Sequence, residues 1–169
     1  MSNFIVNPFR FVVAETQYCQ ENSSEPQPVY SGFGGGTRGG VEWLDGHQVI
    51  GETVTQCTLF LKKVGSPTGT GYVRVYDKAT NTLQHTFGSI DVSTLTTSSA
   101  PYVFDTGDYV PSAGDILCFV FTGGNASNYP AGRKDGGNGY PYEALADYPS
   151  DSWRTVANTQ GYKYCASYE

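Results

Sequence analysis

Residues 59–77, which read LFLKKVGSPTGTGYVRVYD, constrain the fold more than any other part of the chain. Apolar residues occupy alternate positions, Leu59 and Leu61 in the first half and Val73 and Val75 in the second. A period of two is typical of strands with one buried face and one face in water. The glycines and the proline between the halves end one strand, reverse the chain and start the next. The segment therefore predicts two strands joined by a tight connection.

The same alternation recurs toward the C-terminus and predicts an all-β domain. We expect strands near residues 41–44, 53–63, 71–78, 82–90, 100–106 and 115–122, and a last strand in GYKYCASYE, residues 161–169. The segment nearest to a helix is 143–147, one turn at most. Strands spaced roughly 8–15 residues apart, without helical crossovers, favour an antiparallel sandwich of two sheets.

The composition agrees with many short strands and limits the partners. The 169 residues can bury a core as one domain, and they include 21 Gly, 9 Pro and 13 Tyr but only one Met. The formal net charge is −6, and the ten Lys and Arg residues are scattered along the sequence. A surface for nucleic acid or an anionic membrane would concentrate basic residues. We therefore expect no nucleic-acid partner and no membrane partner.

The start of the sequence bears on where the protein folds. No apolar run reaches the roughly 18–20 residues that a membrane span needs. Asn7, Pro8 and Arg10 interrupt the moderately apolar start, and no basic region precedes it as it would in a signal peptide. We therefore expect a chain that is made and folded in a cytoplasm.

The four cysteines, Cys19, Cys57, Cys118 and Cys165, lie too far apart for a zinc knuckle or a CxxC redox motif. Cys57 and Cys118 alternate in phase with apolar neighbours, so both are expected to point into the core. Two alternatives remain for the set. The cysteines are buried free thiols that act as small hydrophobic residues, or Cys19 and Cys165 form a bridge that ties the two ends together. A cytoplasmic origin argues against disulfides.

The first 40 residues differ in character from the rest. An apolar stretch with three phenylalanines precedes residues 20–40, which are rich in Gly, Pro and Ser and cannot form a compact core alone. An assembly can bury such phenylalanines against a neighbour. Residues 4–13 alternate loosely and could form a first strand or an arm that packs on a neighbour. We expect residues 1–40 to be an extended N-terminal arm and loop, and residues 41–169 to be the sandwich domain. The predicted subunit-contact residues are Phe4, Phe9, Phe11, Tyr30 and Phe33.

The chain also resembles a known kind of module. The matching features are LKKVGSPTGT and the following YD, the connection SIDVSTLTT, the AGD turn and the GG that follows FVFT. These features resemble the jelly-roll module of bacteriophage and archaeal-virus structural proteins and of some adhesive or carbohydrate-binding-like domains. The resemblance covers roughly residues 50–130 and, more weakly, the last strand. It implies a jelly-roll β-sandwich, a fold that hosts many functions.

Catalytic motifs do not stand out, and we predict no catalytic residues and no enzyme activity. The chain has two histidines, His47 and His85. His85 lies in a segment that reads as a strand, which favours a structural role. Asp45 could orient His47, but no nucleophile motif accompanies them. Glu42 and Asp45 are close in sequence, yet no short motif selects a carboxylate pair for glycoside hydrolysis.

Two sets of residues remain as candidate binding sites. Asp and Asn in residues 105–108 and 135–138 could hold a structural calcium ion, but the same residues are also the best turn formers. We assign no cofactor and no metal ligand. The aromatic C-terminal third could stack on sugar rings, or it could pin an irregular loop region or form a subunit interface. The predicted glycan-binding residues are Tyr129, Tyr140, Tyr142 and Trp153.

The leading hypothesis is a non-enzymatic virion structural protein. It would be a capsid decoration (cement) protein or another exterior component of a phage-like particle, and it would stabilise the assembly by subunit contacts. Its partners would be the major capsid protein or another virion protein, with the chain as a homo-oligomer or bound to a lattice. It would be assembled in the host cytoplasm and end on the virion exterior. The alternative is an extracellular glycan-binding or adhesive jelly-roll module that recognises cell-surface carbohydrate.

Overall fold

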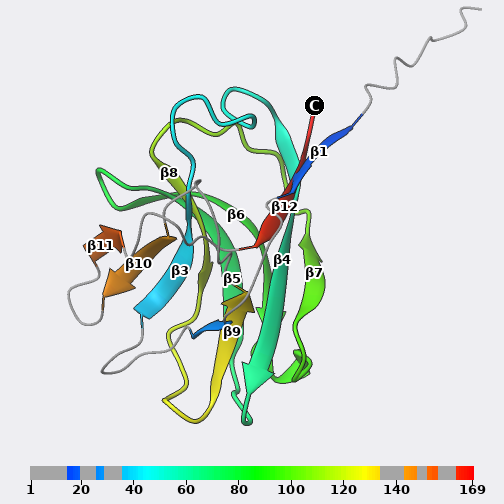
Figure 1. Cartoon of the computed structure of the whole chain (residues 1–169), viewed down its shortest axis with the longest axis vertical. Coiled ribbons are helices and arrows are strands. Elements are labelled where there is room, and N and C mark those ends of the chain that lie inside the picture. Colours follow the sequence, from blue (N-terminus) through cyan, green and yellow to red (C-terminus); the bar gives the residue numbers. More distant parts are fainter. Residues whose placement is uncertain (1–14, 20–25, 29–35, 134–142, 148–151, 156–162) are drawn as a thin grey trace, which may run out of the picture.

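The computed structural model describes residues 15–19, 26–28, 36–133, 143–147, 152–155 and 163–169. Its strands form two antiparallel sheets packed against each other (Figure 1), so the predicted all-β sandwich is confirmed. Sheet A contains β1 (Thr16–Cys19), β2 (Pro26–Pro28), β4 (Val54–Val64), β7 (Ala100–Phe104), β9 (Tyr129–Arg133) and β12 (Tyr164–Tyr168). Sheet B contains β3 (Gly36–Glu42), β5 (Thr70–Asp77), β6 (Thr82–Asp91), β8 (Asp115–Val120), β10 (Glu143–Asp147) and β11 (Ser152–Thr155). Over the described ranges, no helix is long and apolar enough to cross a membrane.

The order of the strands is that of a jelly roll. In sheet A the path contains β1-β12-β4, and β7 pairs with the edge of β4 that does not pair with β12. In sheet B the path contains β3-β8-β5-β6. Along the chain, β3, the β5-β6 hairpin and β8 belong to sheet B, whereas β4, β7 and β9 belong to sheet A. The chain thus crosses repeatedly between the sheets, as in other jelly rolls.

The two strands predicted in residues 59–77 are present, but they lie in different sheets. β4 belongs to sheet A and β5 to sheet B, so the connection between them turns a corner of the sandwich. Gly65 and Gly69 adopt φ values of 66° and 113° there, which favour glycine. Leu59, Leu61, Val73 and Val75 consequently all point into one core from its two sides.

The main core lies between the sheets and is dominated by large apolar side chains. Trp43, Phe87, Phe119, Phe121 and Tyr164 are among its fully buried members. Each such side chain contributes roughly 1.5–3 kcal/mol when it leaves water. Burial of these side chains is therefore a main contribution to the packing of the two sheets face to face.

A second apolar cluster lies on the opposite face of sheet B. Alternate residues of β8 (Ile116, Cys118 and Val120) are buried in it, whereas Leu117 and Phe119 point into the main core. Cys57 does lie in the main core, as predicted. Cys118 is also buried, as predicted, but in this second cluster and not between the sheets. β8 is buried on both of its faces, and alternation alone does not say which face is the inner one.

The N-terminal third departs most from expectation. The sequence predicts a loop over residues 20–40, but β2 and β3 lie partly or wholly within it, and the boundary predicted after residue 40 falls inside β3. The glycines of β3 hide its alternation. One of them has a packing reason, because a Cβ on Gly40 would lie 2.6 Å from the Cβ of Cys118. Residues 143–147, expected to form at most one helical turn, are strand β10.

Candidate functional site

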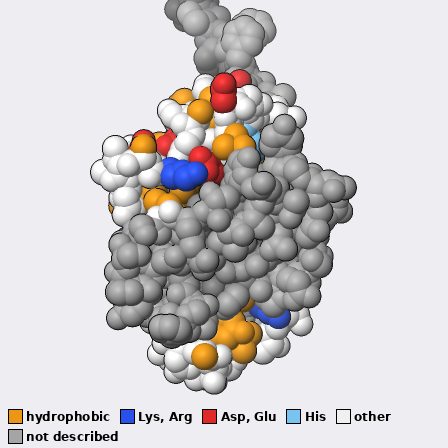
Figure 2. Space-filling view, turned by 60° about the vertical axis from the view of Figure 1, so that its left-hand side comes forward, with side chains coloured by type: hydrophobic (Ala, Val, Ile, Leu, Met, Phe, Trp, Pro, Cys, Tyr) orange, Lys and Arg blue, Asp and Glu red, His pale blue; other side chains and the backbone are white. Residues whose placement is uncertain are grey.

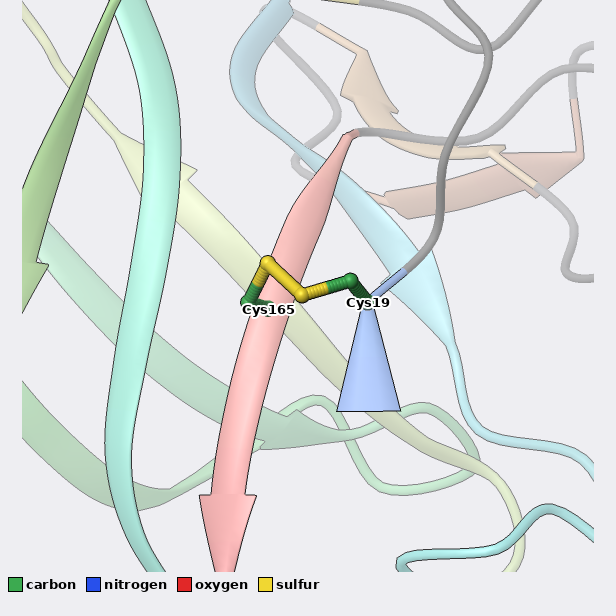
Figure 3. The surroundings of a disulfide bond; sticks show 2 residues. All are labelled: Cys19 and Cys165. Atoms are coloured by element: carbon green, nitrogen blue, oxygen red, sulfur yellow. A yellow bond between two sulfur atoms is a disulfide. The ribbon is translucent and has the colours of Figure 1, made fainter. Parts of the chain in front are cut away.

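Strand β1 forms an edge of sheet A and is covalently attached to its neighbour. Cys19 and Cys165 face each other across the antiparallel β1/β12 pair, with 4.1 Å between their Cα atoms, and a disulfide joins them (Figure 3). The bridge spans a sequence separation of 146 residues. Of the two alternatives for the cysteines, the bridge is confirmed for this pair, while Cys57 and Cys118 are buried free thiols.

The side chains of β1 differ in how far they enter the protein. Glu15, Thr16 and Gln17 are exposed, whereas Tyr18 and Cys19 are partly buried. The ring of Tyr18 lies 4.6 Å from the ring of His47 in an edge-on arrangement, measured between centroids. Within the described residues, β1 therefore enters the protein mainly through Tyr18 and the disulfide.

A chain of hydrogen-bonded rings continues inward from Tyr18. Its centroid lies 5.7 Å from that of Tyr164, a fully buried residue of β12. The indole N–H of Trp43 donates to the Tyr164 hydroxyl at 2.9 Å, and Nε2 of His47 lies 3.1 Å from the same oxygen. Burial raises the pKa of Tyr164 well above its usual value. The hydroxyl therefore stays protonated and serves as a structural hydrogen-bonding group.

The contacts of His47 define its protonation state. The backbone N–H of Val49 donates to Nδ1 at 3.3 Å, so the proton of the neutral ring lies on Nε2 and faces Tyr164. Burial lowers the pKa of His47, which favours this neutral form. Asp45, considered above as an orienting partner, is exposed, and the hydrogen bonds of the imidazole go to Val49 and Tyr164 instead.

The outer face of sheet B carries a second group of candidate side chains. The register aligns Trp153 of β11 with Ala146, Arg38 and Val120 across four strands. Arg38 is buried, and its guanidinium lies 4.4 Å from the ring centroid of Tyr76 and 4.6 Å from that of Trp153. Its Nη1 donates to the Asn81 side chain at 2.9 Å. The two ring centroids are themselves 5.8 Å apart, with the planes tilted by 60°, so the guanidinium lies against a pair of touching rings. A cation over the face of an aromatic ring is a stabilising cation–π arrangement.

Two N–H donors on this outer face have no hydrogen-bond partner among the described residues. They are Nε of Arg74 and Nε1 of Trp153, both buried. The Arg74 guanidinium lies 4.2 Å from the ring centroid of Tyr72. Nearby, Lys78 pairs with the buried Glu42 at 2.6 Å. Basic and acidic side chains also lie next to each other and beside apolar ones in the view of Figure 2. The face thus combines stacked rings with charged groups.

The predicted glycan-binding residues are only partly placed. Tyr129 lies in β9 of sheet A and Trp153 in β11 of sheet B, so the two belong to different sheets. Tyr140 and Tyr142 lie outside the described residues. The predicted subunit-contact residues, Phe4, Phe9, Phe11, Tyr30 and Phe33, also lie outside them.

The remaining residues considered for chemistry have structural surroundings. His85 stacks on Tyr109 at 5.4 Å and meets Phe87 edge-on at 4.5 Å, measured between centroids. Asp105 and Asp108 are exposed in a turn, and residues 135–138 lie outside the described ranges. Across the described ranges, no group of three or more His, Cys, Asp or Glu residues is arranged to hold a metal ion.

The sequence did not predict the hydrogen-bonded rings around Tyr164 or the stacking of Arg38, and the reasons differ. Tyr18, Trp43, His47 and Tyr164 come from distant parts of the chain, and Arg38 lies in a glycine-rich stretch without a strand signal.

No protein-family profile, curated protein or solved structure is significantly similar to the chain.

Proposed function

We propose that this chain is a non-enzymatic structural protein of a virion exterior, of the capsid decoration or cement type. In this proposal it stabilises a particle by contacts between subunits. Phe4, Phe9 and Phe11, which precede β1 in the sequence, make these contacts against a neighbouring subunit or capsid protein.

The observation that carries this proposal is the disulfide between Cys19 and Cys165. A four-residue edge strand is a weak anchor, yet mechanical force on the residues before Glu15 acts on β1 first. The disulfide transmits this force to β12, which pairs directly with β4 in the middle of sheet A. This is the anchorage that a contact arm needs. A disulfide also persists in the oxidising surroundings of a released particle.

Deletion of residues 1–14 tests the proposal, because it removes the three phenylalanines and keeps β1 with Cys19. The truncated chain is expected to fold and to lose binding to purified particles. The triple substitution F4S/F9S/F11S should act in the same way. A matched control, L83S/V103S/V110S, changes three exposed apolar residues of the sandwich and should bind normally. Absence of the chain from native particles by mass spectrometry, or full binding by the truncated chain, would refute the proposal.

A second candidate function is glycan recognition on the outer face of sheet B. The observation that favours it is the grouping of three partly exposed rings, Trp153, Tyr76 and Tyr72, with the partly exposed guanidinium group of Arg74. Aromatic rings stack on sugar faces, and guanidinium groups bind carboxylates of acidic sugars.

A glycan array with the intact protein tests this second function. Binding should disappear in Trp153→Ala and persist in Tyr129→Ala, because Tyr129 belongs to the other sheet. Equal loss in both variants would contradict a site on sheet B. Circular dichroism of each variant verifies that its fold is unchanged.

A further inference from the structure

Among the described residues, β1 is held to β12 by a short strand pairing, the ring contacts of Tyr18 and the disulfide. β1 has four residues, and β12 is its sheet neighbour. Its first two residues are exposed, and Tyr18 supplies its ring contacts to His47 and Tyr164. Isolated strand pairs of this length are marginally stable in water. The Cys19–Cys165 disulfide is therefore the main restraint on β1.

The surface of β12 that β1 covers is complementary to β1. In β12, the residues Tyr164 to Ser167 are buried. Without β1, the outer edge of β12 would present a row of unpaired backbone groups, which is a template for another strand. A strand that fits must place a ring against Tyr164 and a small side chain opposite Cys165. Residues 16–19 of a second copy meet both requirements, because β1 already does so in the described register.

We propose that β1 is an exchangeable strand, which pairs with β12 of its own chain or of a second copy, and that the disulfide fixes whichever pairing is present when it forms. Reduction opens the exchange. Two molecules of a thiol such as glutathione attack the Cys19–Cys165 bond in turn, through a mixed disulfide. They leave two cysteine thiols and one molecule of glutathione disulfide. Glutathione disulfide reverses the reaction, and Cys19 then bonds to whichever Cys165 it faces.

Chain length limits the geometry of the exchanged pair. Seven Cα–Cα steps separate Cys19 from Pro26, and an extended chain covers about 25 Å over them. The two copies must therefore lie side by side. Pairing within one chain has the higher effective concentration, so exchange requires a high concentration of neighbouring copies. This inference is independent of the proposed virion function, because it concerns the purified protein.

The test mixes copies of the full chain labelled with ¹⁴N and ¹⁵N. The mixture is reduced with glutathione at high protein concentration, reoxidised with glutathione disulfide and digested, and the Cys19–Cys165 peptides are identified by mass spectrometry. We expect peptides with one light and one heavy half, in a fraction that rises with protein concentration toward about one half, the value for random pairing. Linked peptides that are all light or all heavy at every concentration would overturn the proposal.

Two controls separate strand exchange from other routes to mixed peptides. The mixture that is never reduced should give no mixed peptides. The variant C57A/C118A removes the free thiols and should give the same fraction of mixed Cys19–Cys165 peptides as the wild-type chain. If this variant does not fold, the peptide map of the wild-type chain serves as the test of whether Cys57 or Cys118 takes part in a disulfide. Circular dichroism of the reduced protein must show an intact sandwich. A reduced protein that is unfolded throughout would also overturn the proposal, because β1 would then not exchange on a folded body.

Discussion

The indole N–H of Trp43 donates a 2.9 Å hydrogen bond to the hydroxyl of Tyr164, and both side chains are fully buried. Trp43 follows the end of β3 and Tyr164 begins β12, so this bond links the two sheets across the core. The same hydroxyl meets His47, whose ring contacts Tyr18 of β1. These contacts therefore connect strand β1, which carries Cys19, to the interior of the sandwich.

The substitution Tyr164→Phe should destabilise the protein by about 1–3 kcal/mol, because it leaves the buried donor of Trp43 without its acceptor. Urea unfolding followed by tryptophan fluorescence measures the change. Tyr102→Phe is the matched control. Its hydroxyl accepts a bond from the exposed backbone of Thr96, which water can replace, so a loss below about 0.5 kcal/mol is expected. Equal losses in the two variants would contradict a structural role for the Trp43 bond.

Stability should fall as the pH is lowered through the range in which His47 titrates. Burial lowers the pKa of His47, so the unfolded chain binds more protons than the folded protein below about pH 6.5. The stability due to neutral His47 is thus present above this pH and is lost as the pH falls toward the folded pKa. Thermal unfolding between pH 7.5 and 5 should show the decline in the wild type and in His85→Gln, but a smaller one in His47→Gln.

Carboxylates contribute to a separate, more acidic range. Hydrogen bonds from the backbone of Thr80 and Ser93 lower the pKa values of Asp77 and Asp91 respectively. Their stabilising effect is present above the usual carboxyl pKa of about 4 and is lost below it.

A pH dependence of stability between pH 7.5 and 5 that is identical in His47→Gln and the wild type would show that His47 does not cause it.

Loss of the disulfide should lower the free energy of unfolding by about 2–5 kcal/mol, because the bridge closes a very long loop in the unfolded chain. Cys19→Ser, Cys165→Ser and the double variant should be destabilised equally, since each removes the same bond. Guanidinium unfolding of the three variants and of the wild type measures this. A double variant that loses the sum of the two single losses would show that each cysteine acts independently of the bond.

Replacement of Arg38 by Lys should cost about 1–3 kcal/mol, because an ammonium group lacks the planar face that the guanidinium lays against the rings of Tyr76 and Trp153. Arg74→Lys is the matched control on the same face. Its guanidinium lies over one ring, that of Tyr72, so a smaller loss is expected. The comparison uses chemical unfolding of both variants. A larger loss for Arg74→Lys would contradict the stacking explanation.

The strands whose side chains alternate could be predicted from the amino-acid sequence alone. Leu59 and Leu61 in β4, and Val73 and Val75 in β5, could be assigned because alternation is a local property of an extended chain. Burial of Cys57 followed from the same rule. β3 could not be assigned in this way, since the glycines around Arg38 carry no side chain to alternate.

The neighbours of each strand could not be predicted in this way, because they depend on the packing of the whole fold. Local pattern does not say that β4 and β5 lie in different sheets, or that Cys118 faces outward from sheet B. The pairing of Cys19 with Cys165 depends on the register of β1 against β12, which are separated by almost the whole chain. The cluster of Trp43, His47 and Tyr164 forms for the same reason. Side chains distant in sequence are brought together by the packing of complete sheets, which no local pattern encodes.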